Sequence, residues 1–107
     1  MLTVASADSD AHLIDTFRML LRDGKADGFI LPRAMEEDAR VKLLREADVP
    51  FVLYGRQKDP TGCCWFDIRG EDAMRDAVHH LAGLGHDRIA FINGGRIYSY
   101  ARLRHEG

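Results

Sequence analysis

The sequence is poor in the features that mark several protein classes. It has two cysteines, three prolines and one tryptophan in 107 residues, and no apolar run approaches the roughly 20 residues that span a bilayer. The first residues lack the basic segment and apolar core of an export signal. The 15 Lys and Arg are interspersed with 17 Asp and Glu, whereas a free-standing nucleic-acid-binding module is normally basic. We therefore expect one cytoplasmic globular domain without a membrane segment.

The two cysteines, Cys63 and Cys64, are adjacent. Neighbouring residues of a strand point to opposite faces, so a bridge between these two thiols would be strained. No other spacing of cysteine or histidine suggests a metal cage. We expect reduced thiols, no metal site and no cofactor.

Apolar runs alternate with helical periodicity along the whole chain. Helices are expected at Leu13–Leu21, Ala39–Ala47, Ala73–Leu84 and Tyr98–Glu106. Strands are expected at Leu2–Ala7, Gly28–Leu31, Val49–Tyr54, Cys63–Ile68 and Ile89–Ile92. Such alternation, with unbroken apolar strands, predicts an α/β fold with a doubly wound, open parallel sheet covered by helices on both sides. Sheets of this kind bind ligands beyond the carboxyl ends of their strands.

One segment is distinctive. In residues 81–94, a helix pattern ends in Leu84-Gly85-His86, and Arg88 then leads into an apolar run that ends at Gly94. This stretch resembles the most recognisable part of the lactose-repressor (LacI) type of bacterial transcription regulators. The Asp-Gly strand at 27–31, the Pro-Val strand at 49–53, the turn at 67–70 and the helix start at 101–104 resemble the same family in order and spacing. The likeness covers essentially all 107 residues.

The resemblance implies a periplasmic-binding-protein-like sensing domain, present in part. Residues 1–88 would belong to its first lobe, without that lobe's first strand, and residues 89–107 would begin the second lobe. The DNA-binding head of the family is absent. We expect the missing strand to lie between Leu2–Ala7 and Gly28–Leu31, and therefore expect the isolated chain not to be a stable monomer. In the complete protein we expect a homodimer that pairs through Leu2–Ala7 and Leu13–Leu21.

The function implied by the resemblance is regulation of transcription, first of all repression, by a protein whose binding to operator DNA is controlled by a small molecule. A sugar is expected before a purine. The alternative is an exported sugar-binding receptor of a transport system, which shares the fold; the Gly85-His86 pair speaks against it. An enzyme fragment is a further alternative, but no nucleophile–base–orienter set is apparent, so we expect no enzyme.

Arg102 is the first candidate for ligand binding, because it matches the family position whose guanidinium binds the effector. A planar fork of five donors can bridge two hydroxyls or a carboxylate. Arg96 lies in the preceding loop, at a position where purine-sensing relatives carry a ligand-touching arginine. A solvated surface arginine is the alternative at each position.

Tyr98, together with Tyr100, could stack on a sugar or a base, or could pack at the helix start. Asp67 resembles the family aspartate at the lobe crossover, where it could touch ligand or hold a turn. Glycines Gly94 and Gly95 permit close approach of the backbone. Gly85 and His86 are expected to cap a helix and to serve as hinge elements.

Overall fold

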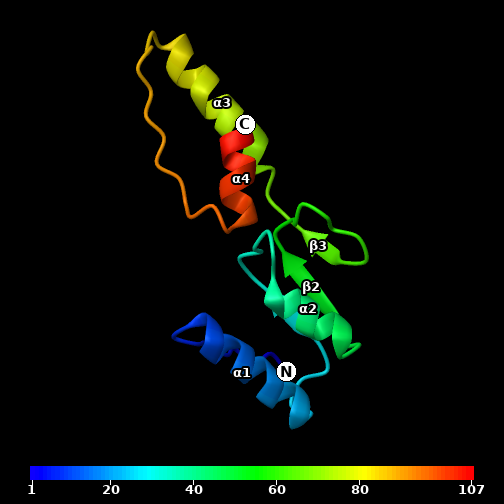
Figure 1. The fold of residues 1–107 in the computed structure, drawn as a ribbon. Coiled ribbons are helices and arrows are strands. Elements are labelled where there is room, and N and C mark those ends of the chain that lie inside the picture. Colours follow the sequence, from blue (N-terminus) through cyan, green and yellow to red (C-terminus); the bar gives the residue numbers. More distant parts are fainter. The chain divides into compact units, whose positions relative to one another are not determined.

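A computed structural model describes residues 1–107 and contains four helices and three strands (Figure 1). The chain divides into two compact units. The first comprises Met1–Phe29 and Asp38–Phe51, and the second comprises Ile30–Glu37 and Val52–Gly107. This division differs from a lobe boundary after residue 88, which stays a prediction. None of the helices is long and apolar enough to span a bilayer.

The first unit contains helices α1 (Asp10–Arg22) and α2 (Ala39–Glu46), which contact each other. Each helix begins at a side-chain cap. Ser9 Oγ accepts a hydrogen bond from the amide of His12 at 3.2 Å, and Asp38 accepts one from the amide of Arg40 at 3.1 Å. These bonds satisfy amides that the first turn of a helix leaves open.

Aromatic and aliphatic side chains make up the core of this unit. Phe17 of α1 is buried, and its ring lies 5.1 Å from that of Phe29. Val41 and Leu44 of α2 are also buried. Phe17 and Leu44 belong to the apolar stripes that predicted these two helices, and both expected helices are confirmed.

The second unit is built on a sheet with the strand order β1 (Phe29–Leu31), β2 (Phe51–Tyr54), β3 (Cys64–Phe66). Strands β2 and β3 are parallel, and Leu53 is opposite Trp65. Leu31 and Leu53 are almost completely buried. The unit therefore shows the expected parallel α/β fold in incomplete form.

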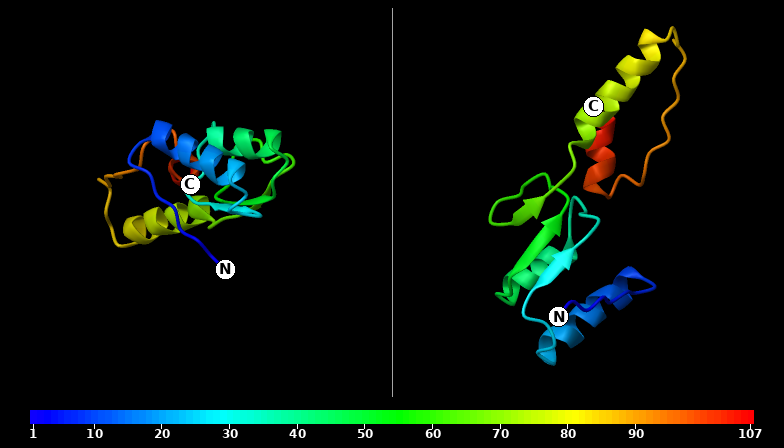
Figure 2. Two further views of the ribbon diagram at one scale, coloured as in Figure 1. Left: turned by 90° about the horizontal axis from the view of Figure 1, so that it is seen from below. Right: turned by 180° about the vertical axis from the view of Figure 1, so that it is seen from behind.

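Helices α3 (Gly70–Gly83) and α4 (Ser99–Glu106) pack side by side in the second unit (Figures 1 and 2). The packing buries Ala101 and Leu103 of α4, whereas α3 has no buried residue. Helix α3 begins three residues before the apolar stripe that predicted it. The acidic residues Glu71 and Asp72 in its first turn favour this start, because they complement the positive end of the helix dipole.

Two expected strands are absent. Residues 1–7 form no strand, and residues 89–92 lie in a long irregular connection between α3 and α4. Leu2 is 78% exposed and Ile92 is 96% exposed. An apolar segment becomes a strand only where a neighbour supplies the partners for its amides and carbonyls, and neither segment has such a neighbour. The prediction of strands at Leu2–Ala7 and Ile89–Ile92 was wrong for this structure.

Candidate ligand-binding site

A cleft of about 200 Å³ opens in the second unit at the carboxyl ends of the strands. Its walls come from the residues that follow β1, β2 and β3 and from α4. The lining residues are Arg33, Ala34, Tyr54, Gly55, Asp67, Ile68, Gly70, Tyr100, Leu103 and Arg104. The segments that follow the three strands therefore meet here, as expected for ligand sites of parallel sheets.

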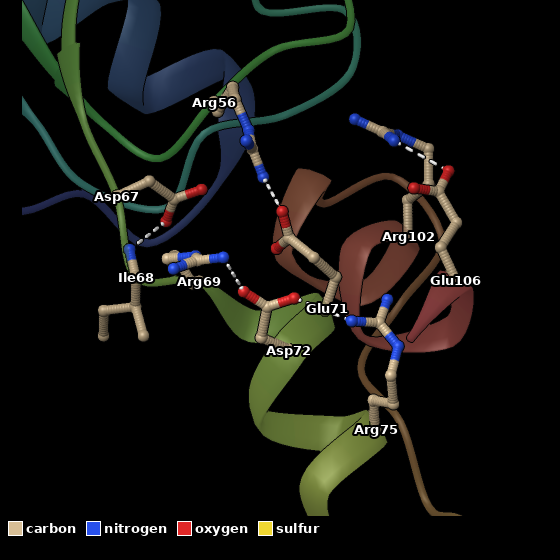
Figure 3. Close-up of polar contacts among 9 residues, drawn as sticks. All are labelled: Arg56, Asp67, Ile68, Arg69, Glu71, Asp72, Arg75, Arg102 and Glu106. Atoms are coloured by element: carbon tan, nitrogen blue, oxygen red, sulfur yellow. Dashed lines mark hydrogen bonds and ion pairs between the residues drawn. The ribbon is translucent and has the colours of Figure 1, made fainter.

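Asp67 is one of two predicted ligand residues that line this cleft, and Tyr100 is the other. One carboxylate oxygen accepts a hydrogen bond from the amide of Ile68 at 2.8 Å (Figure 3). The other oxygen, Oδ2, is buried without a hydrogen-bond partner. A buried acceptor without a partner costs free energy, so this oxygen is available to a hydroxyl or amine of a ligand. Asp67 thus stabilises the turn before α3 with one carboxylate oxygen, and its other oxygen can accept a hydrogen bond from a ligand.

Arg102 does not line the cleft, but it lies on α4 next to the lining residue Leu103. Its Nε donates to Glu36 at 2.7 Å, and its Nη1 donates to Glu106 at 2.8 Å. Its side chain is 28% exposed. The hydrogen bonds that the guanidinium donates to Glu106 and, second in effect, to Glu36 raise the pKa of Arg102 above its ordinary value. Two carboxylates therefore orient Arg102 while other N–H donors of its fork stay open.

A second ion pair joins the loop after β2 to the first turn of α3. Arg56 Nη2 donates to Glu71 at 2.7 Å, and both side chains are partly buried (Figure 3). This hydrogen bond is the main reason why the pKa of Glu71 lies below its usual value. In the same turn, Asp72 pairs with both Arg69 and Arg75. These contacts attach α3 to the strand ends beside the cleft.

The two predicted ligand residues of the connection before α4 are placed differently. Arg96 is exposed and belongs to neither the cleft lining nor any ion pair. Tyr98 is half-buried, and the centroid of its ring lies 4.6 Å from the guanidinium of Arg33 and 5.5 Å from the centroid of the Tyr100 ring. Tyr98 is therefore packed against two lining residues, while Arg96 is not brought to the cleft.

The predicted hinge glycines have distinct settings. Gly85 has a φ of +92° and follows the last turn of α3. The amide of His86 donates to Leu81 and that of Gly85 donates to Ala82, which is the Schellman pattern of helix ends. His86 thus caps α3 through its backbone, while its side chain is exposed. Gly94 and Gly95 lie in the connection to α4, where the side chain of Asn93 donates to the carbonyl of Ala101 at 2.7 Å. A hinge role for these residues stays a prediction.

The sequence did not indicate Arg33 or Arg104 as lining residues. Arg33 has a φ of +57°, an uncommon conformation for a non-glycine residue. Arg104 lies one turn beyond the cleft-facing Tyr100, with its guanidinium 5.0 Å from that ring. The i, i+4 spacing on α4 was the available signal for Arg104. No group of three or more His, Cys, Asp or Glu side chains in residues 1–107 could hold a metal ion.

Comparison with known proteins gives the class: the proteins that this chain resembles are regulators of transcription. The regulator AglR of Rhizobium meliloti is 33% identical over 93 residues, which are 86% of this chain and 26% of AglR. A regulatory protein of the LacI family from Chloroflexus aggregans is 36% identical with a TM-score of 0.78, over 92% of this chain and 36% of that one. A transcription-regulator-like protein from Staphylococcus haemolyticus, 23% identical, shares the fold with a TM-score of 0.92 over 97% of this chain and 39% of that one.

The chain is accordingly similar to LacI-type transcription regulators over most of its length, as its sequence suggested. No family model matches it. It spans less than a third of the length of the curated relatives that it matches. The relatives are regulators, which lends no support to the alternative of an exported receptor.

Proposed function

We propose that this chain is the effector-binding part of a cytoplasmic repressor whose binding to operator DNA is controlled by a small, hydroxyl-rich molecule. A sugar is favoured over a purine as this molecule. The cleft at the strand ends carries this proposal. Its walls offer the open acceptor of Asp67, the guanidinium groups of Arg33 and Arg104 and the phenol of Tyr100. A mixed set of donors and acceptors suits hydroxyl groups, which both donate and accept.

In the proposed mechanism, the effector favours one arrangement of two lobes and so changes how paired DNA-binding heads meet the operator. Arg102 would take part by exchanging a bond to Glu36 or Glu106 for a bond to the ligand. Arg96 and Tyr98 would approach the ligand in the same lobe movement.

The proposal is tested by a thermal-shift screen of the full-length protein with galactose, maltose, raffinose and hypoxanthine. A ligand that binds only the native state raises the melting temperature in proportion to the logarithm of its concentration above Kd. A concentration-dependent rise with a saccharide supports the proposal. A rise in melting temperature with hypoxanthine alone would indicate a purine effector in place of a sugar. An unchanged melting temperature with all four compounds would contradict the proposal that the cleft binds an effector.

We also propose a homodimer in the full-length protein, paired through residues 1–7 and helix α1. Leu2 and Val4 are 78% and 87% exposed, and Met19 of α1 is 43% exposed. Exposed apolar side chains of this kind favour a covered position in an assembly. Sedimentation equilibrium should report a dimer at micromolar concentration. A monomer at that concentration would exclude the pairing.

A further inference from the structure

Four side chains form a stacked ladder along one wall of the cleft. The guanidinium of Arg33 lies over the ring of Tyr98, this ring stacks on Tyr100 with an interplanar angle of 13°, and the guanidinium of Arg104 lies 5.0 Å from the ring of Tyr100. Three of the four, Arg33, Tyr100 and Arg104, line the cleft. Cation–π and offset-stacked contacts each favour one ring orientation, so the ladder holds the phenol of Tyr100 in a defined place.

The stacking also limits how Tyr100 can meet a ligand. Tyr98 is stacked on its ring, and Arg104 also lies against it. With the ring engaged in this way, Tyr100 is a fixed part of the cleft wall rather than an open platform for stacking. A side chain placed in this way limits the size of a ligand sterically and by hydrogen bonding.

Gly94 determines where the tip of Tyr100 can lie. A β-carbon added at Gly94 would overlap the Tyr100 hydroxyl and lie 2.7 Å from its Cε2, closer than two such atoms can approach. A β-carbon at the neighbouring Gly95 would meet Tyr98 at 3.8 Å, an ordinary contact. Because Tyr98 and Arg104 hold the ring, it cannot retreat without breaking the ladder. The absence of a side chain at Gly94 is therefore required for the observed position of Tyr100.

We infer that Tyr100 contacts the effector and sets the largest ligand that the cleft accepts, and that Gly94 is the positioning residue that acts through it. This inference rests on the proposed function of the cleft. The two residues act together, because the absence of a side chain at Gly94 permits the position of the Tyr100 ring, and this ring forms part of the cleft wall.

The test is a double-substitution cycle in the full-length protein, with affinity for galactose and for raffinose measured by titration calorimetry. The informative quantity is the ratio of the two affinities. Tyr100→Ala opens the wall and should raise the affinity for raffinose relative to that for galactose. The expected change in the ratio is about tenfold or more, the usual scale of discrimination by pocket size. Gly94→Ala should also change the ratio, whereas Gly95→Ala, the matched control, should leave it within about twofold of wild type.

The decisive measurement is Gly94→Ala in the Tyr100→Ala background. If Gly94 acts through the ring, its substitution should change the ratio no further once the ring is gone, so that the two effects are non-additive. Additive effects, or a ratio that Tyr100→Ala leaves unchanged, would overturn the inference while the proposed function stands. A general loss of packing would lower both affinities alike and leave the ratio constant.

If the wild-type protein binds hypoxanthine and no saccharide, the ratio is taken between hypoxanthine and inosine, which differ by a ribose. In that case the sugar effector is wrong, and the roles of Tyr100 and Gly94 are still decided by the same cycle. Binding of none of these compounds would overturn the proposed function and this inference together.

Discussion

Arg102 is held by two carboxylates in this structure, and any ligand bond to its guanidinium has to compete with them. The contacts with Glu36 and Glu106 orient the fork, and the retained charge strengthens its hydrogen bonds to a ligand. The same contacts make Arg102 part of the link between α4 and the segment after β1. Its two roles can be separated by measuring ligand binding and stability independently.

We expect Arg102→Ala in the full-length protein to abolish the response to effector while operator binding persists, because the arginine is proposed to contact ligand and not DNA. The loss of a charge-assisted hydrogen bond should weaken ligand affinity by roughly 1.5–3 kcal/mol, measurable by titration calorimetry. Arg88→Ala, at an exposed position without an ion pair, serves as control. Unchanged affinity in Arg102→Ala would show that the residue does not bind the effector.

Glu71 should make stability depend on pH. Its pKa is lowered in the folded state, chiefly by the hydrogen bond from Arg56. A group with a lowered folded pKa stabilises the fold above its unfolded pKa, and this contribution is lost as the pH falls through the folded value. Glu71→Gln should therefore lower the free energy of unfolding by about 0.2–1 kcal/mol at pH 7, and the difference should shrink below about pH 4.5. Urea denaturation of the full-length wild type and variant at pH 7 and at pH 3.5 measures this difference in free energy of unfolding. An equal difference at both pH values would contradict a lowered pKa of Glu71 in the folded state.

At the scale of elements, the C-terminal end of α3 is decided by a glycine in the left-handed conformation. Gly85 has a φ of +92°, and a β-carbon there has open space around it. Any destabilisation by Gly85→Ala therefore arises from backbone conformation alone, without a steric clash. Gly83 also lies in open space but is the last residue of the helix itself.

The two glycines should respond to alanine with opposite signs. Gly85→Ala should destabilise the protein by about 1–2 kcal/mol, because L-residues are disfavoured in the left-handed region. Gly83→Ala should stabilise it by up to about 0.5–1 kcal/mol, since alanine is the better helix former. Urea denaturation of the full-length protein, followed by circular dichroism, gives both values. Destabilisation of similar size by both substitutions would mean that the Schellman end of α3 does not form.

At the scale of the whole molecule, much apolar surface lacks a partner within these residues. Helix α3 buries none of its side chains, and Val78, Leu84 and Phe91 are 42%, 64% and 44% exposed. A small domain gains its modest stability from the apolar area that it buries. The surface left open in α3 and in residues 86–97 therefore predicts low stability for the 107 residues by themselves.

We expect a peptide of residues 1–107 to show no cooperative unfolding transition as a monomer. The measurement is circular dichroism during a urea titration, repeated over a tenfold range of peptide concentration. A steep transition whose midpoint is independent of concentration would contradict the prediction. A transition that sharpens with concentration would instead indicate that a second copy covers the exposed surface.

Most helices and strands could be predicted from the sequence, because the spacing of apolar residues along the chain indicates them. The stripes of α1 and α2, the apolar cores of β1 and β2 and the family-like Gly85-His86 end of α3 all depend on neighbours in sequence. Asp67 could be predicted in the cleft because the residue after a parallel strand lies at the ligand-binding edge of the sheet. The strand at 89–92 could not be judged in this way, since pairing needs a partner that local sequence does not reveal.

The tertiary structure alone decided how the side chains meet. Glu36 and Arg102 lie 66 residues apart in the chain, and no local pattern indicates that they form an ion pair. The contact of Gly94 with Tyr100, the stacking of Arg33 on Tyr98 and the carboxylate oxygen of Asp67 without a partner likewise arise from packing. The sequence by itself determined the resemblance to LacI-type regulators, the parallel α/β pattern and the segments that supply the site. The tertiary structure determined which side chains reach the cleft, because contacts between distant residues depend on distances that only the packed chain defines.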